Sequence, residues 1–118
     1  LAHCGDDLNV WSGNDDQTVA MMALGAKGVI SVAANVVPQI MAEMTKACLD
    51  GDFKRGAELQ LKYFELCDKL FVEVNPIPVK TALNLMGKEV GDLRLPLCDM
   101  TEANLEKLKA AMKGAGIL

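Results

Sequence analysis

The sequence has 118 residues, of which 51% are hydrophobic and 24% are charged, a balance that indicates a globular domain rather than a disordered chain. Its formal net charge of −4 argues against binding to nucleic acid or to an anionic membrane, because both partners need a basic surface. No apolar run reaches the roughly 18 residues that a membrane span needs. The four cysteines form no C-x-x-C pair, so we expect reduced thiols in a cytoplasmic protein, with no metal site and no cofactor.

Residues 8–33 carry the pattern of a strand, a helix and a second strand. Residues 8–12 are short and rich in strand formers. Asn14, Asp15 and Asp16 would cap and begin a helix that Gly25 ends. Residues 28–33 are apolar on both faces, as in a parallel strand covered by helices. The pattern therefore predicts one β–α–β unit.

From residue 38 onward the pattern predicts helices only. Pro38 favours a first helical turn, and Asp50 with Gly51 would end that helix. Its apolar stripe is Val37, Met41, Met44 and Cys48. The next helix, over about residues 53–72, carries two apolar stripes and should be widely buried. One stripe is Ala57, Leu61, Phe64, Cys67 and Phe71, and the other is Leu59, Tyr63, Leu66 and Leu70.

The last third of the chain should contain two more helices. Residues 75–78, Asn-Pro-Ile-Pro, form a rigid break, after which a helix continues to Gly87. Residues 93–97 should be an extended linker, and Thr101 would cap a final helix. Two parallel strands alone are too few for a stable sheet. We therefore expect either further strands from elsewhere or a chain that is part of a larger α/β domain.

Four stretches of the sequence resemble the C-terminal part of the dihydrodipicolinate synthase family, within the pyruvate-dependent class I aldolase superfamily. They are WSGNDD (11–16), GAKGVISVAANVVP (25–38), KLFVEVNPIPVKTALNLMG (69–87) and LRLPL (93–97). The resemblance covers essentially all 118 residues in order. The combination of GVISV, AN-x-x-P and NPIPVK carries it, because related lyases share the first motif more loosely.

The resemblance implies the fold of the parent protein. That fold is an eight-stranded β/α barrel of the TIM type with a C-terminal three-helix extension, assembled as a homotetramer. Residues 1–52 would supply the last part of the barrel, with strands seven and eight and their helices. Residues 53–118 would form the C-terminal helical domain. The chain itself would be mainly helical with one β–α–β unit.

The resemblance also implies the chemistry of the parent, a cytoplasmic lyase of lysine (diaminopimelate) biosynthesis. A lysine forms a Schiff base with pyruvate, and the resulting enamine attacks L-aspartate 4-semialdehyde. The matching positions of this chain include no catalytic residue, so the chain alone should be inactive. Gly13 and Ile30 would contact substrate through their backbone, and Leu24 would lie at an oligomer contact.

Each of these positions also has a purely structural interpretation. Gly13 could be a turn residue, and Ile30 has the pattern of a core side chain, which is compatible with a backbone contact to substrate. Leu24 lies on the mildly exposed side of its helix pattern. Asn35 is more readily explained as a residue that stabilises the turn after the second strand.

Several reactive side chains are poor candidates for chemistry. Lys27 precedes the second strand and Lys80 begins a helix, so neither has the desolvated pocket that a nucleophilic lysine needs. Asp15 and Asp16 would repel a phosphate at the start of their helix. The remaining two, His3 near the first residue and Tyr63 on an apolar stripe, are not expected to act in catalysis.

Two alternatives remain open at this stage. One is another pyruvate aldolase of the superfamily, similar to N-acetylneuraminate lyase, which would differ in its aldehyde partner. The other is a helical module without catalytic activity, whose role is oligomerisation. In either case the open two-stranded edge needs to be covered, so we expect either that identical chains associate or that residues 1–36 rearrange.

Overall fold

The computed structural model describes the backbone of all 118 residues and the side chains of residues 1–5 and 7–118. It is mostly helical, as predicted, and divides into two compact units, Leu1–Lys62 and Tyr63–Leu118. None of the helices in the described part of the chain is long and apolar enough to cross a membrane. The domain boundary predicted between residues 52 and 53 refers to the parent barrel and stays a prediction. In this structure, the helix that follows residue 52 packs within the first unit.

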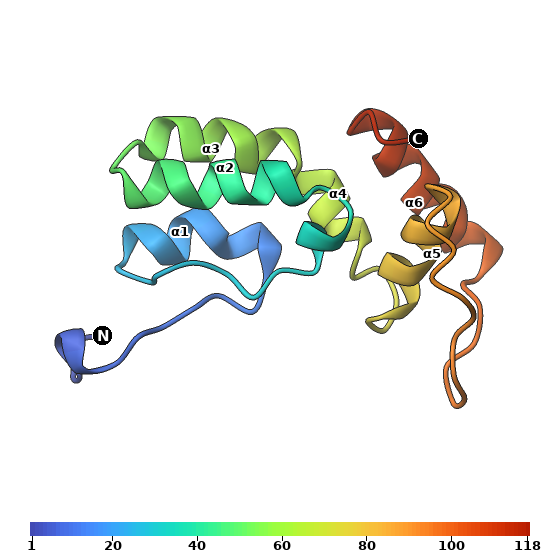
Figure 1. Cartoon of the computed structure of the whole chain (residues 1–118), viewed down its shortest axis with the longest axis horizontal. Coiled ribbons are helices and arrows are strands. Elements are labelled where there is room, and N and C mark those ends of the chain that lie inside the picture. Colours follow the sequence, from blue (N-terminus) through green and yellow to red (C-terminus); the bar gives the residue numbers. More distant parts are fainter. The chain divides into compact units, whose positions relative to one another are not determined.

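Three α-helices and three short 3₁₀ turns form the first unit. The helices are α1 (Thr18–Ala23), α2 (Pro38–Leu49) and α3 (Phe53–Lys62), and the turns are Gly5–Asp7, Asp15–Gln17 and Ala33–Asn35. All three helices contact one another, and Figure 1 shows them side by side. The second unit contains α4 (Phe64–Lys69), α5 (Ile77–Leu85) and α6 (Glu102–Gly114), with α6 packed on both α4 and α5.

Helix α2 confirms the prediction made from its local signals. It begins at Pro38, which lacks an N–H where a helix has no partner for one. It ends before Gly51, whose φ of +85° is left-handed and favours glycine. The predicted stripe is buried: Val37, Met41, Met44 and Cys48 are each at most 5% exposed.

The predicted β–α–β unit is not formed as two regular strands. Within the described backbone, residues 8–12 and 28–33 pair in parallel at a single bridge between Ser12 and Val29. The N–H of Ser12 donates to the carbonyl of Gly28 at 2.9 Å, and the N–H of Ile30 donates to the carbonyl of Ser12 at 2.9 Å. The run at 28–33 also ends early, because Ala33–Asn35 turns into a 3₁₀ helix.

A shift of register at Gly28 explains why the pairing stops. In the register set by Ser12 and Ile30, the carbonyl of Val10 would accept from Gly28, but it accepts from the N–H of Lys27 at 2.8 Å. Gly28 has a φ of +153°, a conformation that side chains rarely adopt. This one-residue bulge disrupts the ladder, and two segments without neighbouring strands cannot extend it.

The helix predicted over residues 53–72 is broken at Tyr63, which separates α3 from α4. The stripe of Leu59, Tyr63, Leu66 and Leu70 is buried, as predicted. The other stripe is only partly buried: Cys67 is 1% exposed, but Leu61 is 75% exposed and Phe64 and Phe71 are about 40% exposed. The two helices together therefore bury less of their surface than the continuous pattern predicted.

Helices α2 and α3 pack closely because residue 56 is a glycine. Gly56 is buried on α3, and a Cβ added there would lie 2.6 Å from the Sγ of Cys48 on α2. The Cys48 thiol is buried, and this burial, followed by the nearby charge of Asp52, raises its pKa. Cys48 is therefore a packing residue on the side of α2 that faces α3.

In the second unit, the Glu73 carboxylate organises the start of α6. One of its oxygens, Oε1, accepts hydrogen bonds from the N–H of Thr101 (3.1 Å), the hydroxyl of Thr101 (2.8 Å) and the amide of Asn104 (2.9 Å). Thr101 is the N-cap residue, as predicted, but its own side chain does not cap the helix. The bonds from Asn104 and Thr101 lower the pKa of Glu73.

Substituting Gly56→Ala should destabilise the first unit. The added methyl must displace Cys48, and overpacking of this kind costs about 1–3 kcal/mol, only partly offset by the helix propensity of alanine. Urea unfolding measures the change. A Cys48→Ala background should remove most of the loss, and Gly114→Ala on α6, where the methyl meets nothing within 4 Å, is the matched control. Equal effects of the two glycine substitutions would contradict the packing argument.

Substituting Glu73→Gln should change how the stability of the second unit depends on pH. Because the folded-state pKa of Glu73 is lowered, its carboxylate stabilises the fold above the ordinary glutamate pKa of about 4.3. That contribution is lost as the pH falls through the folded-state pKa. The variant should therefore be less stable than the parent sequence near pH 7 and approach it in acid. Urea unfolding over the pH range tests this, with the exposed Glu89→Gln as control, and a constant difference would count against the role of Glu73.

Candidate functional site

The candidate site of the first unit is built around the carboxylate of Asp15. This side chain is only 1% exposed, and its Oδ2 accepts hydrogen bonds from the N–H groups of Val32 and Ala33, both at 3.0 Å. Its other oxygen, Oδ1, has no hydrogen-bond partner among the described residues. A buried carboxylate needs such donors to offset the loss of water. Asp15 thus joins the segment after the first expected strand to the last residues of the second.

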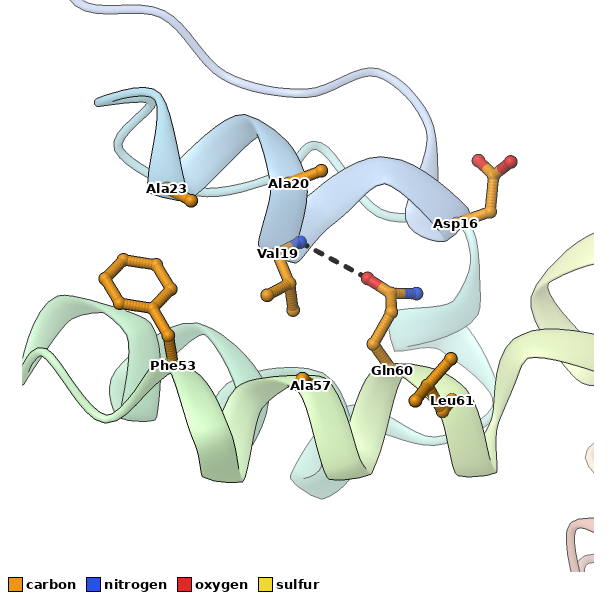
Figure 2. A pocket seen from close by; sticks show the side chains of 8 residues that line it. All are labelled: Asp16, Val19, Ala20, Ala23, Phe53, Ala57, Gln60 and Leu61. Carbon is orange, nitrogen blue, oxygen red and sulfur yellow. Dashed lines mark hydrogen bonds between the residues drawn. The ribbon is translucent and has the colours of Figure 1, made fainter.

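The backbone of Asp15 is held from the other side by two buried polar side chains. Its carbonyl accepts hydrogen bonds from the hydroxyl of Thr18 at 2.9 Å and from the Nε2 of Gln60 at 2.9 Å. The Oε1 of Gln60 in turn accepts from the N–H of Val19 at 3.3 Å, a bond drawn as the dashed line in Figure 2. Gln60 lies on α3, so one amide side chain ties α3 to the turn that begins α1.

The structure brings Gly13 and Ile30, the two predicted substrate contacts, to the same end of the paired segments. The N–H of Ile30 bonds the carbonyl of Ser12, the residue before Gly13. The hydroxyl of Ser12 donates to the carbonyl of Asn14 at 2.8 Å and accepts from its N–H at 3.1 Å, which holds the backbone turn at Gly13. Gly13 is exposed, and nothing lies within 4 Å of where a Cβ would be.

The expectation that Ile30 is a core side chain is wrong. Its side chain is 72% exposed, and Trp11 on the paired segment is 49% exposed. The reason is that no further layer of the described chain covers this face of the bridge. The backbone role proposed for Ile30 does not depend on where its side chain packs.

Leu24, the predicted oligomer contact, is 77% exposed directly after α1. It borders an apolar groove of about 470 Å³, which is lined by Leu1, Ala2, Val10, Met21, Leu24 and Ala26. A second apolar groove, of about 400 Å³, lies between α1 and α3. Figure 2 shows Ala20 and Ala23 on α1 facing Phe53 and Ala57 on α3, with Leu61 and Asp16 toward the other end.

The reactive side chains weighed from the sequence are not gathered in one place. Lys27 is exposed on the loop before the bridge, and the Nζ of Lys80 donates to the carbonyl of Asp92 in the second unit. His3 is exposed and Tyr63 is buried. Among the described side chains, no three His, Cys, Asp or Glu residues come together as metal ligands do. The side chain of Asn35 donates to the carbonyl of Val32 at 2.9 Å, which fits the structural interpretation.

Sequence reasoning missed the role of Asp15. Asp15 begins a helical turn, as predicted, in the 3₁₀ segment Asp15–Gln17 that leads into α1. Its carboxylate, however, also occupies two N–H groups that could have bound an anion. Its backbone partners lie 17 and 18 residues further along the chain, so no side-chain motif marks them. The available signal was an acidic residue shortly after one strand-like segment (Asp15 after 8–12), combined with small residues at the end of the next (Ala33 and Ala34).

Known proteins match essentially the whole length of this chain. The model of a family described as the dihydrodipicolinate synthetase family matches residues 1–115. A 4-hydroxy-tetrahydrodipicolinate synthase from Acetivibrio thermocellus is 51% identical over 118 residues, which is 100% of this chain and 40% of that protein. The enzyme of the same name from Methanocaldococcus jannaschii is 50% identical over 111 residues, covering 94% of this chain and 38% of that protein.

Solved structures agree with these relatives. The dihydrodipicolinate synthase from Aquifex aeolicus matches with a TM-score of 0.91 and 46% identity, over 96% of this chain and 39% of that one. The chloride-inhibited dihydrodipicolinate synthase from Acinetobacter baumannii, solved in complex with pyruvate, matches with a TM-score of 0.89 and 41% identity, over 94% and 38%. The chain thus spans about two-fifths of the length of the proteins that it matches.

Proposed function

Because this chain belongs to the dihydrodipicolinate synthetase family, we propose that it is the C-terminal part of a 4-hydroxy-tetrahydrodipicolinate synthase. The whole enzyme would condense pyruvate with L-aspartate 4-semialdehyde through a lysine Schiff base, as a cytoplasmic lyase of lysine (diaminopimelate) biosynthesis. The observation that carries the proposal is identity of 51% along the entire chain with a relative of that name.

In this proposal, the chain contributes backbone rather than reactive side chains to the pyruvate site. Gly13 and Ile30 are its substrate-facing residues, and their positions at one end of the paired segments support that assignment. The relative solved with pyruvate bound supports pyruvate as the ligand. The Schiff-base lysine would come from the part of the enzyme that this chain does not contain. The exposed setting of Lys27 and the bond that Lys80 makes to a loop carbonyl support this division.

A chimeric enzyme tests the proposed function. In it, this chain replaces the matching 40% of the Acetivibrio thermocellus synthase, which supplies the remaining strands and their side chains. We expect the chimera to condense pyruvate with aspartate semialdehyde within about ten-fold of the unmodified synthase, because the exchanged parts share half of their residues.

The matched control for the chimera is the isolated 118-residue chain treated with pyruvate and borohydride, which should gain no covalent adduct. A folded chimera without condensing activity would overturn the proposed function. A pyruvate adduct on the isolated chain would overturn the placement of the lysine outside it. Cleavage of N-acetylneuraminate by the chimera, in place of condensation, would favour the other aldolase.

We further propose that identical chains associate through the apolar surface around the end of α1. Leu24 is 77% exposed, Leu61 is 75% exposed, and apolar grooves lie on both sides of α1. Exposed apolar surface of this kind is typical of an interface. A two-fold arrangement would cover it with the same surface of a second copy.

Substituting Leu24→Asp should lower the mass of the assembly measured by light scattering at a fixed protein concentration, because a charge at the contact would lose its water. Leu95→Asp is the matched control, since Leu95 is 91% exposed on the extended segment of the second unit and should leave the mass unchanged. If Leu24→Asp leaves the mass of the assembly unchanged, Leu24 does not lie at the contact between chains.

A further inference from the structure

We infer that Asp15 is a positioning residue for the pyruvate site: its carboxylate holds the backbone that ends in Ile30 against the backbone that ends in Gly13. The inference rests on the proposed function, and it assigns to Asp15 a task that involves no contact with the substrate. It starts from a buried carboxylate whose bonds, among the side chains that the structure describes, reach both segments of the site.

The geometry leaves few other means of holding these two segments together. They share a single bridge, and the register shift at Gly28 ends their ladder on one side. On the other side, beyond Ile30, the next bonds between them are those from Val32 and Ala33 to the Oδ2 of Asp15. The carboxylate therefore replaces the backbone pairing that a regular strand would have provided.

Asp15 is itself fixed, so that it can transmit a position. Thr18 and Gln60 both donate to its carbonyl at 2.9 Å, and Gln60 is anchored on α3. The side chain is 1% exposed and cannot turn toward solvent. A rotation of this carboxylate would move the N–H groups of Val32 and Ala33, and with them Ile30 two residues before.

The unpaired oxygen indicates which property of Asp15 matters. Oδ1 is buried and accepts no hydrogen bond from the described residues. Among these residues, only one oxygen of the carboxylate is therefore used, and the negative charge itself has no partner at the other. The task of the residue is done by one acceptor atom at a defined place. An amide oxygen could occupy the same place, whereas a hydrocarbon side chain could not.

The test uses the active chimera described above and reads the KM for pyruvate separately from kcat. Asp15→Leu keeps the volume but removes the acceptor, so the site should bind pyruvate more weakly, with KM raised about ten-fold or more and kcat little changed. Asp15→Asn should rescue the KM to within about three-fold, because its amide oxygen can accept from Val32 and Ala33. The KM for aspartate semialdehyde should stay the same in both variants.

Cys48→Ala is the matched control for a merely structural effect. It leaves a cavity between α2 and α3 but keeps Asp15 and both side chains that bond to its carbonyl, so it should lower thermal stability without raising the KM for pyruvate. If Asp15→Leu does not fold, Asp15→Glu, which moves the acceptor by one methylene, takes its place with the same expected rise in KM.

The outcomes separate this inference from the proposed function. An unsubstituted chimera without activity contradicts the proposed function. An active chimera in which Asp15→Leu or Asp15→Glu folds with an unchanged KM for pyruvate overturns the positioning role alone. An equal rise in KM for Asp15→Asn and Asp15→Leu would overturn it as well, since the charge and not the acceptor would then be required.

Discussion

The first unit depends on one buried carboxylate. Two extended segments that share a single bridge have too few backbone bonds to define their relative position, and their outer edges have no neighbouring strand. Asp15 supplies the missing connection by accepting two N–H groups of the second segment while its own carbonyl is held by Thr18 and Gln60. Because the carboxylate is buried and bulk water cannot replace its hydrogen bonds, it must keep these two donors.

The second unit uses the same device at its surface. Glu73 accepts three hydrogen bonds from Thr101 and Asn104, and so orients α6 across an interval of about thirty residues. Asn84 does likewise for the loop after α5, accepting from the N–H of Val90 and donating to the carbonyl of Gly91. In both units, a polar side chain from one segment satisfies the backbone of another where regular structure is absent. This explains how 118 residues with little sheet can still hold defined loops.

What could be predicted from the sequence was what local chemistry decides. Pro38, Gly51 and the stripe of Met41, Met44 and Cys48 determine α2 within one segment, and α2 has the expected bounds and buried face. The strand expected over residues 28–33 does not form, because an apolar run makes a strand possible but does not ensure its pairing. Whether the strand forms depends on the register at Gly28 and on the hydrogen-bond partners of Val32 and Ala33. The helix predicted over residues 53–72 is interrupted at Tyr63 although its apolar periodicity is continuous. Ile30 is exposed because the burial of a side chain depends on whether another part of the chain packs against it. The resemblance identified the family, but it did not identify Asp15.

The proposed site, which would offer backbone to its ligand, also changes what a sequence can reveal about function. The side chain of Ile30 points to no chemistry, and Gly13 needs to be a glycine neither for a left-handed φ nor for a close neighbour within the described chain. Substitutions at such positions can leave the backbone unchanged, so the residues that carry functional information are those that hold the backbone in place. For this chain these are Ser12 at the turn, Asp15 between the two segments and Gln60 on α3. In the proposed site, the buried hydrogen-bond acceptors therefore carry the functional signal, because their geometry determines where the backbone that would contact pyruvate lies.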